Sequence, residues 1–138
     1  MKALRIWMAA VGVFYLLNLL VLWPSIWAPQ VAGMYPGVEL HQGEPIFQLL
    51  LDAWLIVGLG LAAIGVVLIM GSFQPSRYAP ALVPVVFITE FVFGLWDIYS
   101  GMNYEEPIIV IITLVIHVLI IGSGLWAWKK SSTERVAS

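Results

Sequence analysis

Four long apolar runs divide the chain, and each is long enough to form a helix that crosses a lipid bilayer. The runs cover approximately residues 6–23, 46–70, 81–99 and 108–128. A helix rises about 1.5 Å per residue, so about 20 residues cross the roughly 30 Å of hydrocarbon in a bilayer. The pattern therefore predicts an all-α protein, an integral membrane bundle of four helices that run up, down, up and down.

The segments outside these runs differ in character. Residues 24–45 form a long connection in which prolines and glycines recur, and this composition argues against an extended helix. We expect this outer loop to fold over the adjoining mouth of the bundle. Residues 131–138 are small and polar without apolar periodicity. We therefore predict a single domain of residues 1–130 followed by a flexible tail.

Two local features bear on helix packing. Gly58 and Ala62 lie one turn apart in the second run, and such a pair of small residues lets another helix approach closely. We interpret the pair as packing inside the bundle rather than as a dimer face. Pro80 and Pro84 fall at the start of the third run, where the first turns of a helix tolerate a missing amide donor.

The basic residues all fall at one end of the predicted bundle. Six are present, before the first helix, between the second and third, and after the fourth: Lys2, Arg5, Arg77, Lys129, Lys130 and Arg135. The two opposite connections contain no Lys or Arg. Because Lys and Arg favour the cytoplasmic side, both termini are predicted to be cytoplasmic and the long connection to face outward. Glu105 and Glu106 are expected in a solvated outer turn before Pro107.

Composition supports a membrane location. Of the 138 residues, 62% are apolar and only 10% are charged, against about a quarter charged in soluble domains. The lipid bilayer is therefore the predicted partner of most of the surface, and a membrane is the predicted location. The chain has no cysteine, which excludes disulfides and thiolate chemistry. The few scattered basic residues argue against a nucleic-acid partner.

Several polar side chains fall inside the predicted spans. An ionisable group there costs about 2.5 to 3.5 kcal/mol on insertion scales, so such groups face a protein interior or a wet cavity. Counted at about 1.5 Å per residue from the outer helix ends, Asp97 lies about 5 Å deep, Asn18 about 8 Å, Asp52 about 10 Å, and Glu90 and His117 about 15 Å. The set predicts an outward-facing polar pocket that binds a ligand through these five residues.

Glu90 and His117 have the same estimated depth on consecutive antiparallel helices, so a hydrogen bond or ion pair between them is within reach. Glu90 and Asp97 lie two turns apart on one face, and Thr113 lies one turn before His117. The Glu90–His117 pair has two interpretations that weigh equally at this point. One is a proton-transfer pair, which makes both residues catalytic candidates, and the other is a polar clasp between two helices.

Asp52 and the outer loop offer weaker signals. Asp52 follows Gln48 by one turn and can bind a cationic or hydroxylated ligand, although a structural bond to Asn18 or to the loop is favoured slightly. In the loop, the spacing of Glu39, His41 and Glu44 is too loose to indicate a metal site. Neither a phosphate loop nor a redox-cofactor motif occurs, so no metal and no cofactor is predicted.

The chain resembles a known family in several segments, namely residues 4–8, 13–18, 34–36, 89–90 and 94–99. These segments are similar to the small membrane proteins encoded in bacterial biphenyl-degradation gene clusters, the BphX-like proteins. The resemblance implies an inner-membrane protein associated with the catabolism of hydrophobic aromatic compounds. More distantly, the layout resembles the DoxX-like and sterol-isomerase-like four-span families. The resemblance to the BphX-like proteins supplies no established catalytic or binding residue.

Two functions therefore follow from the sequence. The first is a non-catalytic role, in which the protein binds or helps to move a small hydrophobic molecule, or serves as an accessory membrane subunit. One protomer of four helices is small for alternating access, so transport would require a homo-oligomer. The alternative is a membrane-embedded enzyme of isomerase type that uses Glu90 and His117 as acid and base on a lipid-soluble substrate.

Overall fold

The computed structural model describes residues 1–136, which form five helices and no strand. The all-helical prediction is confirmed. The helices are α1 (Lys2–Val21), α2 (Pro24–Met34), α3 (Pro45–Ser72), α4 (Pro75–Asn103) and α5 (Pro107–Val136). Four of them, all except α2, are long and apolar enough to cross a membrane.

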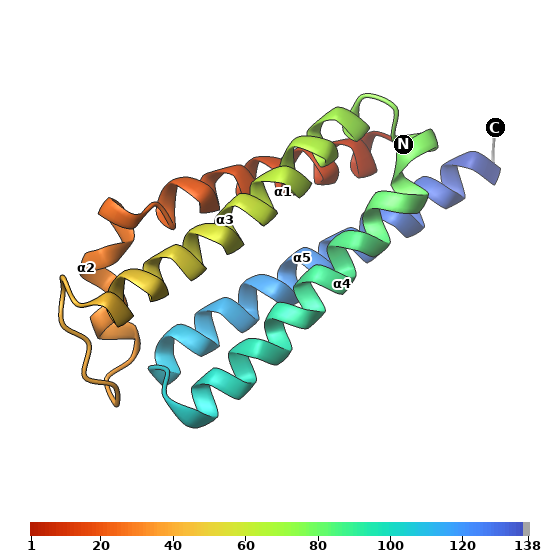
Figure 1. The fold of residues 1–138 in the computed structure, drawn as a ribbon. Helices are drawn as coiled ribbons and strands as arrows, with labels where there is room; N and C mark the ends of the chain where they lie inside the picture. The colour runs from red at the N-terminus through yellow and green to blue at the C-terminus, as the bar shows by residue number, and fades with distance from the viewer. Residues whose placement is uncertain (137–138) are drawn as a thin grey trace.

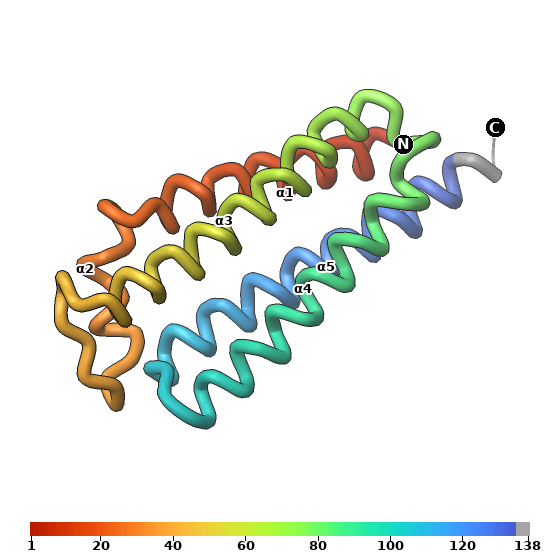
Figure 2. Tube along the Cα trace, viewed as in Figure 1, coloured from red at the N-terminus to blue at the C-terminus, as the bar shows by residue number. Residues whose placement is uncertain are grey.

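The four long helices run side by side with alternating direction, and we call this assembly the bundle (Figure 1). α1 packs along α3, and α4 packs along α5. The start of α1, the α3–α4 turn and the end of α5 lie together, and we call this the terminal end. α2 lies across the opposite end, near the α4–α5 connection, and we call this the α2 end (Figure 2).

Proline marks the start of every helix after the first. Pro24, Pro45, Pro75 and Pro107 are the first residues of α2, α3, α4 and α5. Proline suits this position because its fixed φ angle matches the helix and its missing amide hydrogen has no partner there in any case. None of α1 to α4 has a side-chain cap at its N-terminus. Proline is therefore the main local signal that starts α2, α3 and α4.

The connection between α1 and α3 departs from the expectation of an irregular loop, because its first half is the helix α2. Pro29 lies inside α2 and removes one amide donor. Tertiary contact compensates for this loss, because α2 packs against the start of α3. The contact involves Val31 and Met34 of α2 with Phe47 and Leu51 of α3. The remaining residues, 35–44, form turns and irregular backbone.

α4 and α5 are both longer than the sequence predicted. α4 begins at Pro75, so Pro80 and Pro84 lie inside the helix rather than in its opening turn. α5 continues through residues 131–136, where the sequence predicted a flexible tail. The extension is held in place because Ser131 is fully buried and Glu134 contacts the N-terminal ammonium group. The last two residues of that tail, 137–138, lie outside the described residues.

Glycine sets the close approach of α1 to α3. A Cβ atom added to Gly12 would lie 2.7 Å from the carbonyl oxygen of Gly65, and one added to Gly65 would lie 2.6 Å from the carbonyl oxygen of Gly12. One added to Gly58 would lie 3.3 Å from Cβ of Leu22, the residue that follows α1, and 3.4 Å from Cα of Leu19 on α1. The interpretation of Gly58 and Ala62 as packing within the bundle is therefore confirmed for Gly58, and Ala62 on the same helix is buried.

Two apolar cores fill the two ends of the bundle. The larger core occupies the terminal end and includes Leu4, Trp7, Met8, Leu68, Val83 and Val86. Its Trp7 indole donates hydrogen bonds to the carbonyl oxygen of Ile120 and to Ser123 Oγ, both at 3.2 Å. The smaller core joins α2 to α3 at the α2 end. The candidate site lies between these two cores.

Candidate functional site

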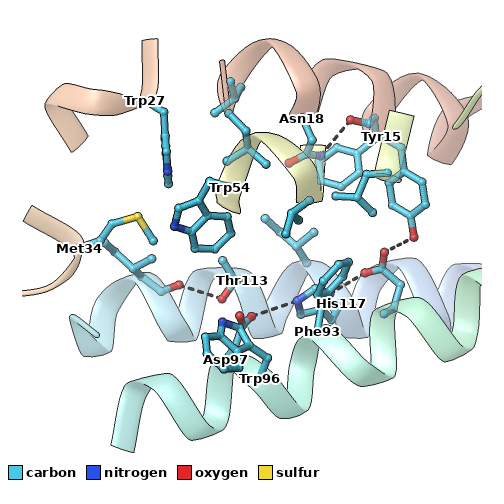
Figure 3. Close-up of a pocket in the computed structure, with 18 of the residues that line it drawn as sticks. Tyr15, Asn18, Trp27, Met34, Trp54, Phe93, Trp96, Asp97, Thr113 and His117 are labelled. Atoms are coloured by element: carbon cyan, nitrogen blue, oxygen red, sulfur yellow. Dashed lines mark hydrogen bonds and ion pairs between the residues drawn. The ribbon is translucent and has the colours of Figure 1, made fainter. Parts of the chain in front are cut away.

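A cavity of about 200 Å³ lies in the half of the bundle toward the α2 end. All five helices and the α4–α5 connection contribute to its wall (Figure 3). Most of the wall is apolar and aromatic, including Phe14, Trp27, Trp54, Phe93 and Trp96. The polar groups on the wall are Tyr15, Asn18, Glu90, Asp97, Glu105, Thr113 and His117. A few polar groups in an aromatic wall are typical of a small-molecule site.

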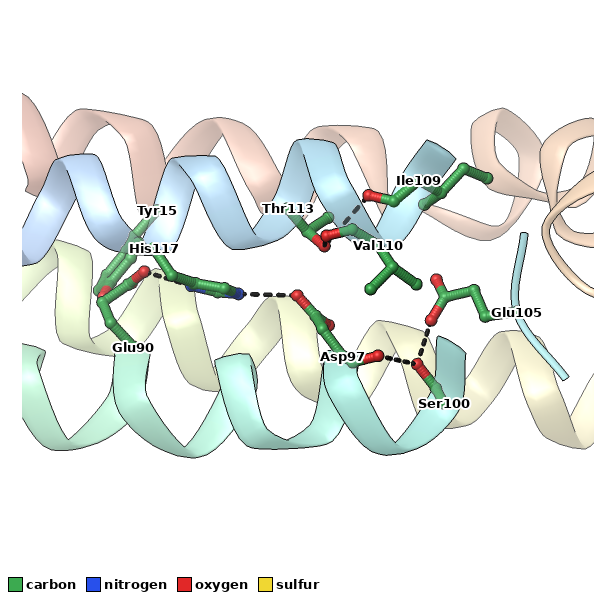
Figure 4. Close-up of polar contacts among 9 residues, drawn as sticks. All are labelled: Tyr15, Glu90, Asp97, Ser100, Glu105, Ile109, Val110, Thr113 and His117. Carbon is green, nitrogen blue, oxygen red and sulfur yellow. Dashed lines mark hydrogen bonds and ion pairs between the residues drawn. The ribbon is translucent and has the colours of Figure 1, made fainter. Parts of the chain in front are cut away.

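Four of these polar groups form a continuous chain of contacts from α1 through α4 to α5. The Tyr15 hydroxyl donates a hydrogen bond to Glu90 Oε1. The second oxygen of Glu90 lies 2.6 Å from His117 Nδ1, and His117 Nε2 lies 3.0 Å from Asp97 Oδ2 (Figure 4). The predicted contact between Glu90 and His117 is therefore present, and the imidazole ring bridges two carboxyl groups.

Burial makes this chain energetically important. Glu90 is only 2% exposed, and His117 and Asp97 are 16% and 13% exposed. An imidazolium ring donates from both nitrogens and satisfies both carboxylates, whereas a neutral ring needs a proton on one carboxyl group to do so. The imidazole therefore joins the two carboxyl groups into one line of hydrogen bonds. The line ends at Tyr15, whose ring belongs to the apolar core of the terminal end.

Local sequence explains how the imidazole reaches both carboxyl groups. Glu90 and Asp97 lie two turns apart on α4, and Gly94 lies between them on the same face. A Cβ atom on Gly94 would lie 3.8 Å from the His117 ring, an ordinary van der Waals distance, so the ring packs directly beside α4 at this position. Phe93 stacks on the other side at 6.5 Å between ring centroids and 28° between ring planes.

The structure brings four of the five predicted binding residues to one wall. Asn18, Glu90, Asp97 and His117 line the cavity. The amide of Asn18 donates to the carbonyl oxygen of Phe14 in its own helix. Asp52 is exposed on α3 and does not line the cavity, so its predicted place in the pocket is wrong. The buried face of α3 carries Phe47, Leu51 and Gly58 instead.

The loose set of acidic residues and histidine in the connection between α2 and α3 stays apart from the cavity. Glu39, His41 and Glu44 are all exposed. Among residues 1–136, no group of three His, Cys, Asp or Glu side chains is placed to hold a metal ion. The groups that bear chemistry are therefore those on the cavity wall.

Two polar groups of the site escaped sequence reasoning, and each had a signal. Tyr15 is one of only two aromatic residues deep within a predicted span that also carry a polar group. Its hydroxyl position, deep in an apolar helix, called for a buried acceptor. Glu105 was expected in a solvated turn, but it is 7% exposed and lines the cavity. Its burial depends on the α4–α5 connection, which sequence does not place.

Glu105 is held by contacts that close the α2 end. The hydroxyl of Ser100 contacts Glu105 Oε2, and it also lies 3.1 Å from the backbone carbonyl oxygen of Asp97 (Figure 4). The Ser100 hydroxyl donates only one hydrogen bond at a time, so the Glu105 carboxyl group and the Asp97 carbonyl oxygen compete for it. The next amide, that of Glu106, donates to the carbonyl oxygen of Met34 at 2.8 Å and ties the connection to α2.

The Glu105 carboxyl predicts a pH dependence of stability. Burial raises its pKa above the usual value, the Ser100 hydrogen bond opposes this, and the nearby Asp97 adds to the rise. Because the pKa is higher in the folded protein, the stabilising contribution is complete below the unfolded pKa and is lost as the pH rises through the folded pKa. Glu105→Gln should therefore be more stable than wild type at pH 8, with the difference shrinking toward pH 4.

Detergent-solubilised protein unfolded at several pH values would measure this difference. Glu44→Gln serves as the control, because Glu44 is exposed just before α3 and lies outside the cavity wall. A Glu105→Gln protein whose stability difference from wild type does not change between pH 4 and pH 8 would contradict the assignment.

Comparison with known proteins places the chain in a family. The BphX-like family model matches residues 1–133. A protein of Burkholderia cepacia described as an uncharacterized BphX-like protein is 52% identical over 135 residues, covering 97% of this chain and 96% of the relative. A second, of Paraburkholderia xenovorans strain LB400 and described in similar words, matches to the same extent. No solved structure matches the chain. The resemblance seen in the sequence is confirmed, and the chain belongs to the BphX-like family.

Proposed function

We propose that this protein binds a small, largely apolar molecule in the cavity between its two cores and does so without chemical conversion. The observation that carries the proposal is the wall itself, which sets a chain of buried polar groups into a ring of aromatic side chains. Such a wall offers apolar area for affinity and a few polar groups for orientation.

A membrane setting belongs to the same proposal. Four helices have the length and apolar character of membrane spans. The Lys and Arg residues lie in segments at the terminal end, and the α2 end has none. Since basic residues favour the cytoplasmic side, we place both termini in the cytoplasm and the cavity in the outer half of the bacterial inner membrane.

The size of the cavity limits the ligand. An apolar cavity of about 150 Å³ holds one benzene molecule, whereas drug-sized ligands need about 300 to 1,000 Å³. The cavity here measures about 200 Å³. It therefore suits a molecule with one ring and a short substituent, and it excludes a larger polycyclic ligand unless the wall moves.

The position of the cavity favours binding over passage through the bundle. Phe14, Val21 and Trp96 line the cavity and are each more than a third exposed, so a lipid-soluble molecule has a route in from the side. Toward the terminal end the bundle is closed by fully buried side chains such as Leu4, Met8 and Leu68. This packed core between the cavity and the terminal end favours binding over passage.

The enzyme alternative meets an obstacle in the geometry of His117. General acid–base chemistry needs a ring nitrogen or a carboxyl oxygen that reaches the substrate. Both nitrogens of His117 contact carboxyl groups, and both oxygens of Glu90 are already engaged by Tyr15 and His117. Catalysis would require these contacts to break, whereas binding uses them as they stand.

A heavy-atom quencher offers a direct test of the proposal. Trp27, Trp54 and Trp96 line the cavity, so a bromine atom bound there should quench their fluorescence. The probe is 2-(4-bromophenyl)ethanol, a neutral single-ring molecule, titrated against the protein in a neutral maltoside detergent. Wild type should show a saturable component of quenching above the linear background from the micelle.

A matched pair of variants locates the quenching. Val57 lines the cavity, whereas Val67 on the same helix is 48% exposed and does not. Val57→Phe should abolish the saturable component and Val67→Phe should keep it, with folding of both verified by circular dichroism. Linear quenching in all three proteins would overturn the proposal. Release of an altered compound from wild type would instead favour the enzyme.

A further inference from the structure

The charged groups on the cavity wall are out of balance. Three carboxyl groups, Glu90, Asp97 and Glu105, line the cavity with one imidazole, that of His117. Among the residues that the structure describes, no Lys or Arg lines it. All the basic residues of the chain fall in segments at the terminal end, namely the first turns of α1, the first turn of α4 and the last turns of α5. The protein therefore supplies at most one positive charge against three carboxyl groups.

The imbalance is concentrated at Asp97 and Glu105. Both oxygens of Glu90 have partners, one in Tyr15 and one in His117. Asp97 uses only Oδ2, toward His117, and Glu105 uses only Oε2, toward Ser100. Within residues 1–136, the other oxygen of each has no hydrogen bond. Glu105 as a whole is only 7% exposed, and what exposure it keeps includes its unpartnered oxygen.

Such oxygens favour a positively charged occupant. A buried carboxyl group must be paired, protonated or matched by a counter-charge, since burying an uncompensated charge is costly. Burial and the nearby Asp97 already raise the pKa of Glu105, which is the response of a carboxyl group that lacks a cation. A neutral ligand leaves this imbalance in place, and an anionic ligand increases it.

The aromatic wall beside these oxygens suits the same occupant. Trp54 and Trp96 line the cavity along with Asp97 and Glu105. Trp27 closes over Trp54 edge to face, with 5.9 Å between ring centroids and 70° between planes. The face of an indole ring attracts an organic cation, and clusters of such rings recognise ammonium groups. The same rings give apolar contact to the rest of the molecule.

We infer that the cavity selects a single-ring organic ammonium ion over neutral and anionic molecules of the same shape. The ammonium group lies against the free carboxylate oxygens of Asp97 and Glu105, and the ring lies among the tryptophans. This inference rests on the proposed function and names the chemical class of its ligand.

Three probes that differ mainly in charge test the selection. They are 2-(4-bromophenyl)ethylamine, which is a cation at neutral pH, 2-(4-bromophenyl)ethanol, and 4-bromophenylacetate, each titrated by tryptophan quenching in a neutral maltoside detergent. The amine should bind at least about tenfold more tightly than the alcohol, the scale of a desolvated cation–π contact with a carboxylate partner. The carboxylate should show no saturable quenching.

Three variants assign the preference to the wall. Asp97→Asn and Glu105→Gln should each remove most of the preference for the amine while keeping saturable binding of the alcohol. Two separate variants are used because Asp97 also contacts His117, so its loss alone can disturb folding. Asp52→Asn is the matched control, since Asp52 is an exposed carboxyl group on α3 outside the cavity, and it should keep the full preference.

The possible outcomes separate this inference from the proposal beneath it. Saturable binding of the alcohol with no advantage for the amine would overturn the inference and leave the proposed function standing. Absence of saturable binding for all three probes would overturn both. An amine preference that survives Asp97→Asn and Glu105→Gln but is lost in Asp52→Asn would overturn the assignment to these carboxyl groups.

Discussion

Replacing Glu90 with alanine is expected to lower the free energy of unfolding by about 3 to 5 kcal/mol, the usual effect of removing one partner from a buried ion pair. Glu90 is the hub that joins α1 to α5, because one of its oxygens accepts from Tyr15 and the other contacts His117. The variant leaves a buried hydroxyl and a buried ring nitrogen without partners. Unfolding in mixed micelles of a maltoside detergent and dodecyl sulfate measures the change.

Graded variants separate the contributions to this effect. Tyr15→Phe removes only one hydrogen bond and should lower stability by about 1 kcal/mol. Asp52→Ala is the control for deleting an exposed carboxyl group from a long apolar helix, and it should stay within about 0.5 kcal/mol of wild type. Replacing Glu90 and His117 together with leucine should recover part of the loss, because the buried pair is removed whole, while the Tyr15 hydroxyl and the Asp97 carboxyl group each still lose a partner. A loss of less than 1 kcal/mol in the Glu90→Ala protein would show that the chain of contacts does not hold the helices together.

Gly65→Ala is the second large effect, with an expected loss of about 1 to 3 kcal/mol from overpacking. Alanine normally stabilises a helix by about 1 kcal/mol relative to glycine, so intrinsic propensity alone predicts a gain. The added methyl group, however, would lie 2.6 Å from the carbonyl oxygen of Gly12. Backbone cannot rotate away as a side chain can, so α1 and α3 must separate. The same unfolding measurement in mixed micelles applies.

Gly60→Ala is a matched control in the same helix. Its Cβ atom would meet nothing within 4 Å, so the variant should be neutral or slightly more stable than wild type. Equal stability of the Gly65→Ala and Gly60→Ala proteins would show that the contact between α1 and α3 is looser than the structure describes. A loss confined to Gly65→Ala would identify this contact as the point where the two helices fit closely.

Sequence by itself determined the elements that depend on local composition. Long apolar runs predict long helices because a backbone that meets no water must satisfy its own hydrogen bonds. The contact between Glu90 and His117 was also within reach of sequence. Consecutive antiparallel helices place residues at equal distances from their shared turn side by side, and the two groups lie 2.6 Å apart. Equal depth put the contact within reach, and the rotation of both helices, which brings the two side chains face to face, came from the tertiary structure.

Only tertiary structure decided what depends on rotation and on distant packing. Sequence placed Asp52 in the pocket, but Asp52 lies outside it. Tyr15 and Glu105 line the pocket, although sequence did not assign them to it. The physical reason is that in a helix apolar on every face, hydrophobicity does not distinguish the inward side, since lipid and protein core are equally apolar. The contact of Gly12 with Gly65 gives α3 its orientation toward α1. That orientation leaves Asp52 outside the cavity.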